Sequence, residues 1–155
     1  MGLLTTEIKN FVNKQKLGFA ATVCPDGTPN LSPKGTTIAW DDDHLVFADI
    51  HSPGTVSNLS HNPSIEINVV DIFIRKGYRF KGIAKVYSEG PIFEKITSFF
   101  RAAGSKHVVQ NIVMVKVERV IEIVSPSYYL GLTQEEIKKR WVDYWNEIHS
   151  KKNPQ

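Results

Sequence analysis

Cysteine is almost absent from this chain of 155 residues, in which Cys24 is the single thiol. One cysteine cannot form an internal disulfide, so the sequence excludes a small domain held together by disulfide bridges. No set of cysteine and histidine residues has the spacing of metal ligands, which argues against a structural zinc site. The acidic run Asp41–Asp43 is followed by no further carboxylates at a loop-type spacing, so we predict a solvated turn there.

Long hydrophobic runs are also missing, although 41% of the residues are hydrophobic. No run approaches the roughly 20 apolar residues that a helix needs to cross a bilayer. The first residues, Met1–Glu7, contain neither a basic segment nor an apolar core, so we predict no secretory signal. We therefore expect a cytoplasmic protein that does not associate with a membrane.

Strong charge of either sign is absent as well, since 19 basic and 16 acidic residues give a net charge of +3. The basic residues form no patch apart from Lys151–Lys152, which we predict to be a solvated end of the chain. We therefore expect no binding of nucleic acid. The composition fits one globular domain spanning residues 1–155.

Motifs for nucleophilic catalysis and for dinucleotide binding are not found. The five histidines are scattered without a paired nucleophile, so no Ser-His-Asp or Cys-His set can be assembled from the sequence. His51 is the one histidine that adjoins a candidate site, described below. No G-x-G-x-x-G motif follows the first predicted strand, which disfavours a Rossmann domain.

Alternating apolar residues and turn signals predict about six or seven strands with antiparallel connections. The predicted strands cover residues 17–24, 29–40, 45–50, 65–69, 78–87 and 108–124. Pro33 and Gly35 interrupt the second strand, and Glu118–Arg119 could divide the last one. We predict turns at Pro25–Gly27, Asp41–Asp43 and Lys76–Gly77, and a loop over residues 125–131.

Helical periodicity predicts four helices, which cover residues 4–15, 53–61, about 91–103 and about 132–150. Thr133 and Glu136 form a capping box at the start of the last helix. This helix has an apolar face of Ile137, Trp141, Tyr144, Trp145 and Ile148. So much aromatic surface must pack on the barrel or on a partner chain. We predict a mainly β fold: a β-barrel with peripheral helices and an extra C-terminal helix.

The stretch from His44 to Pro63 predicts an anion site. A short buried strand leads into a helix for which Ser52 is a suitable N-cap and Pro53 suits the first helical position. Asn62 and Pro63 end that helix. The free N–H groups of a helix N-terminus, together with nearby hydroxyl groups, are suited to binding a phosphate.

Four segments, in this order, resemble one known family. They are Phe19–Pro29, Leu31–Gly35, Phe47–Leu59 with its following Asn62–Pro63, and Tyr78–Ala84 with its following Glu89–Pro91. The chain resembles the pyridoxamine 5'-phosphate oxidase-related flavoproteins, most closely their short stand-alone members, over residues 5–125. The resemblance implies an FMN-binding split β-barrel and a homodimer that holds FMN in a groove at the subunit interface. The helix over residues 132–150 lies outside the shared barrel core.

Carried over residue by residue, the resemblance implies a set of flavin-binding residues. Ser32 and Lys34 would face the flavin. Ala48 and Asp49 would lie along the edge of its ring and offer mostly backbone groups. The remaining members would be the phosphate-binding Ser52 and Thr55, the adjoining Gly54, the bracing Asn58, and Arg79 or Lys81 as further positive charge.

Gly54 departs from the family pattern, because many relatives carry a lysine at this position. The resemblance therefore implies that positive charge comes from Lys34, Arg79 or Lys81. The substrate-binding C-terminal segment of the full-length oxidase is not recognisable, so we do not expect a pyridoxamine phosphate oxidase.

We predict a flavin-dependent oxidoreductase with a small-molecule substrate or electron donor, and we assign no catalytic residue. The alternatives are a non-catalytic flavin- or haem-related binding protein, a barrel that has lost its cofactor, and a relative that binds F420 in place of FMN.

Overall fold

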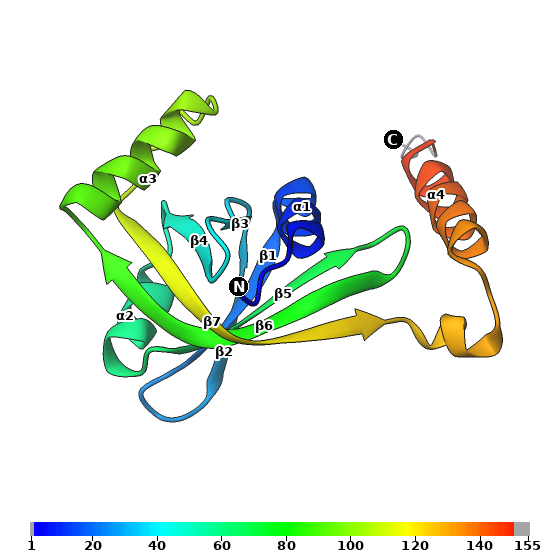
Figure 1. Cartoon of the computed structure of the whole chain (residues 1–155), viewed down its shortest axis with the longest axis horizontal. Helices are drawn as coiled ribbons and strands as arrows, with labels where there is room; N and C mark the ends of the chain where they lie inside the picture. The colour runs from blue at the N-terminus through cyan, green and yellow to red at the C-terminus, as the bar shows by residue number, and fades with distance from the viewer. Residues whose placement is uncertain (1, 151–155) are drawn as a thin grey trace, which may run out of the picture.

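A single antiparallel sheet organises the computed structural model, which describes residues 2–150. Its order is β2-β1-β5-β6-β7-β4-β3 (Figure 1). The strands are β1 (Gly18–Val23), β2 (Pro29–Lys34), β3 (Ile38–Ala39), β4 (His44–Asp49), β5 (Ser64–Asp71), β6 (Lys76–Tyr87) and β7 (Asn111–Val124). The helices are α1 (Thr6–Gln15), α2 (Pro53–His61), α3 (Pro91–Ala102) and α4 (Gln134–Ser150), with a 3-10 helix η1 (Pro126–Leu130). The predicted fold class, mainly β with peripheral helices and an extra C-terminal helix, is confirmed.

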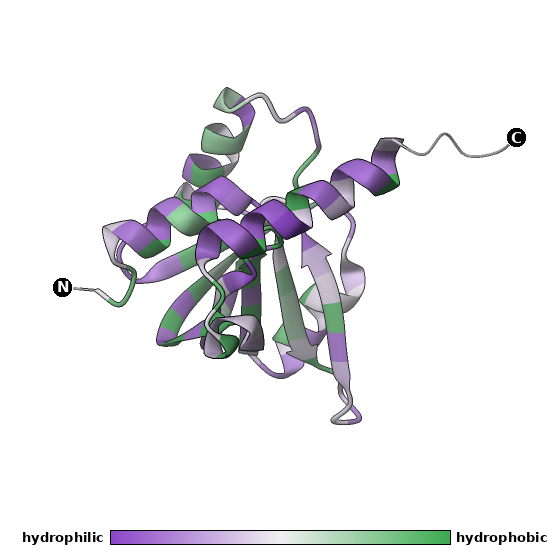
Figure 2. Ribbon diagram, turned by 90° about the vertical axis from the view of Figure 1, so that its right-hand side faces the viewer, coloured by the Kyte–Doolittle hydropathy of each residue, from purple (hydrophilic) through white to green (hydrophobic). Residues whose placement is uncertain are grey.

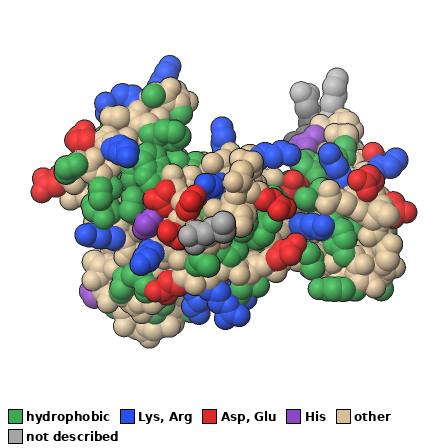
Figure 3. All heavy atoms as spheres, in the orientation of Figure 1, with side chains coloured by type: hydrophobic (Ala, Val, Ile, Leu, Met, Phe, Trp, Pro, Cys, Tyr) green, Lys and Arg blue, Asp and Glu red, His purple; other side chains and the backbone are tan. Residues whose placement is uncertain are grey.

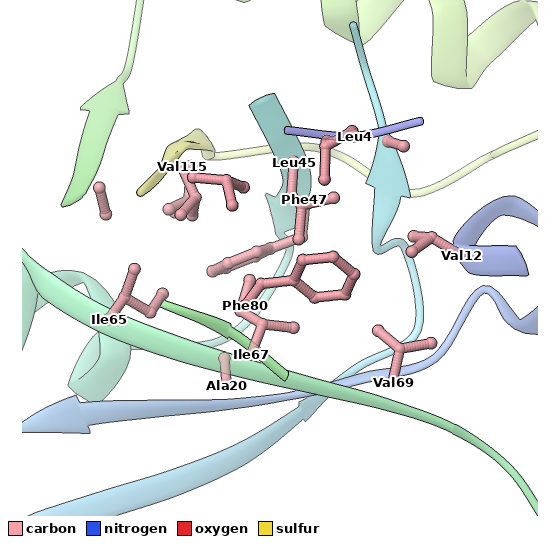
Figure 4. Packing of buried hydrophobic residues seen from close by; sticks show 14 of the residues in the cluster. Leu4, Val12, Ala20, Leu45, Phe47, Ile65, Ile67, Val69, Phe80 and Val115 are labelled. Atoms are coloured by element: carbon pink, nitrogen blue, oxygen red, sulfur yellow. The ribbon is translucent and has the colours of Figure 1, made fainter. Parts of the chain in front are cut away.

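The main hydrophobic core fills the inner face of the curled sheet. Phe47 of β4 and Phe80 of β6 are fully buried there and lie side by side, with Ile67 below them (Figure 4). Helix α1 closes this core with Val12, and its Phe11 ring meets the Tyr78 ring edge to face at 5.2 Å between centroids. Burial of these side chains is the largest favourable term available to a sheet of this kind.

Gly82 allows the backbones of the paired strands β6 and β7 to approach each other closely. A Cβ atom at Gly82 would lie 2.1 Å from the Lys116 carbonyl oxygen, so no other residue fits without a backbone shift. The pairing register shifts beside it, because Lys81 pairs with Arg119 and Gly82 pairs with Val117. Glu118 is therefore the extra residue of a β-bulge, which bends and twists the sheet. The break predicted near Glu118–Arg119 is this bulge, and β7 continues through it.

A second, smaller core lies between α3 and the outer face of β4 and β7. Its buried members are Val46, Ala48, Ile96, Phe100 and Ile112. Alternation along β4 explains the two cores, because Leu45 and Phe47 point into the barrel while Val46 and Ala48 point toward α3. Strand β4 therefore contributes side chains to both cores.

Helix α4 lies at one end of the molecule, beside the hairpin that joins β5 to β6 (Figures 1 and 2). The Arg75 guanidinium lies 3.5 Å from the centroid of the Trp141 ring, and Tyr128 of η1 donates to the Ile74 carbonyl oxygen at 2.6 Å. Ile137 is the buried residue of α4, whereas Tyr144 is 48% exposed. Trp141 thus packs against the rest of the chain as predicted, whereas Tyr144 remains largely exposed.

Three local predictions are corrected by the structure. The strand predicted over residues 29–40 is divided into β2 and β3 at residues 35–37, and residues 108–110 precede β7 rather than belong to it. The turn predicted at Lys76–Gly77 falls on residues 72–75, because Asp71 accepts hydrogen bonds from the N–H groups of Phe73 and Ile74 at 2.9 and 3.1 Å.

Within residues 2–150, no helix has both the length and the hydropathy that a membrane span requires.

Candidate functional site

The ammonium group of Lys34 is the centre of the candidate site. Lys34 is the last residue of β2, and only 3% of its surface is exposed. Its Nζ donates to Ser52 Oγ at 2.7 Å and to Ser32 Oγ at 2.9 Å. Ser32 shares a face of β2 with Lys34 because the two residues are two positions apart. The structure thus brings together Ser32, Lys34 and Ser52, which we call the Lys34 cluster.

The charge of Lys34 is only partly compensated. Burial lowers the pKa of Lys34 from its usual 10.5, and the negative charge of Asp49 opposes this effect. An ammonium group has three N–H donors, and the two hydroxyl groups take two of them. Among the residues that the structure describes, the third donor has no acceptor. A buried cation with a free donor is suited to an anion.

Asp49 holds the segment that leads into α2. Its Oδ1 accepts from the Ser52 N–H at 2.7 Å, and its Oδ2 accepts from Asn111 Nδ2 at 2.8 Å. Ser52 occupies the N-cap position as predicted, but its hydroxyl group accepts from Lys34 and makes no side-chain cap of α2. Pro53 stands in the first turn of α2 and has no N–H, and Val56 donates to the Ser52 carbonyl oxygen at 3.3 Å, so the N–H groups of Gly54 and Thr55 are left for another acceptor.

The next residues of α2 brace the helix against β1. Asn58 is buried and donates from Nδ2 to Thr22 Oγ1 at 3.0 Å. Thr55 is also buried, with 3% of its surface exposed, on the same side of the helix. Gly54 faces open space, since a Cβ atom there would meet nothing within 4 Å. The predicted bracing role of Asn58 thus has a partner, Thr22, that the sequence did not single out.

Ala48 uses its backbone groups within the fold. Its N–H donates to Thr36 Oγ1 at 2.8 Å, and its carbonyl oxygen accepts from the same hydroxyl group at 3.4 Å. Thr36 and Asn111 were missed by sequence reasoning. Neither has a local signal, because each acquires its role through a residue of β4 that is distant in the chain.

Arg79 and Lys81 are not brought to the Lys34 cluster within one chain. Paired residues of neighbouring strands share a face, and Ser32 pairs with Ala20, Ala20 with Ile67, and Ile67 with Phe80. Arg79 and Lys81 flank Phe80 and therefore lie on the opposite face of the sheet. There Arg79 Nε lies 2.8 Å from Glu66 Oε1, and Lys81 pairs with Glu66 across the strands.

Comparison with known proteins identifies the family and the fold. A family model described as pyridoxamine 5'-phosphate oxidase matches residues 4–125. The structure of HupZ from Group A Streptococcus is 33% identical, with a TM-score of 0.72, over 79% of this chain and 96% of the other.

Two more distant structures share the fold. An FMN-binding protein from Syntrophomonas wolfei is 16% identical over 79% of this chain and 87% of its own, with a TM-score of 0.66. HutZ, the haem storage protein from Vibrio cholerae, is 19% identical over 78% of this chain and 94% of its own, with a TM-score of 0.62. Among proteins with curated functions, none matches this chain. The split-barrel fold is therefore shared, and the chain belongs to the pyridoxamine 5'-phosphate oxidase family.

Proposed function

We propose that this protein binds FMN and acts as a flavin-dependent oxidoreductase on a small-molecule substrate. The observation that carries the proposal is the buried Lys34 ammonium group, which has a donor left over and lies beside the N-terminus of α2. Family membership makes a flavin phosphate the first anion to consider. FMN, when bound, supplies hydride or electron transfer, and the protein supplies binding and orientation.

The residues present fit the phosphate of FMN. Lys34 would supply the charge, and Ser32, Ser52 and Thr55 would supply hydroxyl groups. The open space at Gly54 lets a phosphate approach the backbone of the first turn of α2. Asp49 works against this fit, because its negative charge lies close enough to act on Lys34. Within one chain the phosphate would meet a single cation, so we expect a single chain to bind FMN with moderate rather than tight affinity.

A homodimer is part of the proposal. Arg79 and Lys81 lie on the sheet face opposite to the Lys34 cluster, so they can reach a flavin only from a second copy of the chain. The same face exposes Leu31 of β2 and Phe19 of β1 by 67% and 40%. Apolar side chains on an open sheet face support an interface between copies.

The test is a titration of flavin-free protein with FMN, followed by absorbance and flavin fluorescence. Thr55→Ala should weaken binding about tenfold, the effect of one hydrogen bond. A chain that gains no flavin absorption would contradict FMN binding, and parallel titrations with F420 and haem examine the two alternative ligands. If FMN binds, anaerobic reduction by NADH or NADPH separates an oxidoreductase from a passive carrier.

A further inference from the structure

Lys34 and Asp49 are buried groups of opposite charge that the fold holds near each other without pairing them. Only 3% of Lys34 and 2% of Asp49 is exposed. Burial lowers the pKa of Lys34 and the negative charge of Asp49 opposes this effect, yet within residues 2–150 Lys34 forms no ion pair. A buried charge is normally paired, because an unpaired one is costly. Some feature of the fold must therefore keep the carboxylate and the ammonium group apart.

The Asp49 carboxylate is held by two donors of its own. Its Oδ1 accepts from the Ser52 N–H, which belongs to the same turn, and its Oδ2 accepts from Asn111 Nδ2 at 2.8 Å. Asn111 is the first residue of β7 and pairs with Asp49, the last residue of β4. The Gln110 N–H donates to the Asp49 carbonyl oxygen at 2.9 Å beside this pair. The register of β4 and β7 thus places the Asn111 amide on the carboxylate.

Lys34 differs from the other cations of the chain in its surroundings. Exposed lysine and arginine side chains gather at the lower edge of the molecule in Figure 3, near β6 and β7, where water solvates them. Lys34 Nζ instead lies 5.7 Å from the centroid of the Phe47 ring and donates to two serine hydroxyl groups. Its remaining donor is the one that a displaced Asp49 carboxylate would take.

We propose that Asn111 is a positioning residue, which holds the Asp49 carboxylate away from Lys34 and so keeps the ammonium group available to an anion. Without the Asn111 amide, Oδ2 of Asp49 would lose its side-chain donor in a buried place. Rotation toward Lys34 would then satisfy both charged groups and close the anion site. This inference rests on the proposed function, because it takes the Lys34 cluster to be the anion site.

Asn111→Leu tests the proposal, because it removes the donor and keeps a side chain of similar size. Inorganic phosphate should bind this variant about tenfold more weakly, since Asp49 would compete for Lys34. Without phosphate, the pKa of Lys34 should rise in the variant, because a closer carboxylate favours the ammonium form. NMR of the Lys34 side chain, assigned by the loss of its signal in Lys34→Met, follows both titrations. Asn111→Ala takes the place of Asn111→Leu if the leucine variant does not fold.

Asp49→Asn supplies a background in which no carboxylate can pair with Lys34. If Asn111 acts through Asp49, adding Asn111→Leu to Asp49→Asn should change neither the phosphate affinity nor the pKa of Lys34. Asn68→Leu is the matched control, because Asn68 is also half-buried and pairs with Arg79 on the other face of the sheet. This control should leave both quantities unchanged.

Equal losses of phosphate affinity in the two backgrounds would show that Asn111 only supports the fold, and they would overturn the proposal. Unchanged phosphate affinity and unchanged Lys34 pKa in Asn111→Leu would overturn it too, as would a natural protein that binds no phosphate. A parallel titration with FMN separates this proposal from the proposed function. Phosphate binding that depends on Asn111, together with no binding of FMN, would contradict the flavin proposal and leave the role of Asn111 intact.

Discussion

Replacing Lys34 by methionine should separate stability from cofactor binding. Methionine keeps an unbranched apolar stem of similar volume and removes the buried charge. The substitution loses the two hydrogen bonds to Ser32 and Ser52 but also removes the desolvation cost of an ammonium group that has no carboxylate hydrogen bonded to it. Replacing a whole buried ion pair by apolar groups is often neutral or stabilising by about 1–4 kcal/mol, and we expect Lys34, which forms no ion pair within hydrogen-bond distance, to follow the low end of this range. We expect the free energy of unfolding of the flavin-free protein to rise by about 1 kcal/mol at pH 7.

The same substitution should weaken FMN binding by about 10- to 100-fold. This factor corresponds to the loss of one charge-assisted hydrogen bond, typically worth about 1.5–3 kcal/mol. Lys138→Met is the matched control, because Lys138 is an exposed lysine of α4, away from the Lys34 cluster. Urea unfolding and FMN titration of the three proteins provide the measurements.

The pH dependence of this stability difference follows from the lowered pKa of Lys34. Between that lowered pKa and the usual 10.5, the unfolded chain binds more protons than the folded one. The stability of the natural protein should therefore rise with pH in this window relative to Lys34→Met, and the advantage of the variant should shrink. A variant that is less stable at pH 7 and binds FMN with unchanged affinity would show that Lys34 is only a structural contact.

The remaining predictions concern the sheet and the C-terminal helix. Gly82→Ala should destabilise the protein by about 2–3 kcal/mol, because its Cβ would lie 2.1 Å from the Lys116 carbonyl oxygen. A Cβ atom at Gly54 would meet nothing within 4 Å, so Gly54→Ala should leave the free energy of unfolding in urea unchanged or raise it slightly. Equal losses of stability in the Gly82 and Gly54 variants would refute this reasoning. Trp141→Ala removes the contact with Arg75 and should speed cleavage of residues 126–150 by a protease, whereas an unchanged cleavage rate would show that other contacts hold α4.

Local signals predicted the elements well where the deciding residues are close in sequence. Pro53 and Asn62–Pro63 gave α2 its observed bounds, Pro53–His61. The turn before β6 was missed for a physical reason. Gly77 suggested a turn, but the structure uses it for close packing, since a Cβ atom there would lie 2.2 Å from the Val69 carbonyl oxygen. The actual turn has apolar residues, and the Asp71 carboxylate stabilises it.

The candidate site was less predictable, because its geometry depends on contacts between distant segments. Ser52 has the sequence context of an N-cap, yet its hydroxyl group accepts a hydrogen bond from Lys34, 18 positions earlier. No local pattern shows that Lys34 ends β2 in a buried position, or that Asn111 holds Asp49. Whether Arg79 and Lys81 lie near Lys34 depends on the strand register, which the sequence does not show. The register places both residues on the other face of the sheet.

The prolines of β2 have a further consequence, because β2 is an edge strand of the sheet. Proline has no N–H, so Pro29 and Pro33 fit this strand where their nitrogens point away from β1. Leu31 lies midway between them and offers the one N–H donor on the open side of this stretch. An edge with so few donors is a poor template for a foreign strand. The prolines thus protect the exposed Leu31 region against edge-to-edge aggregation.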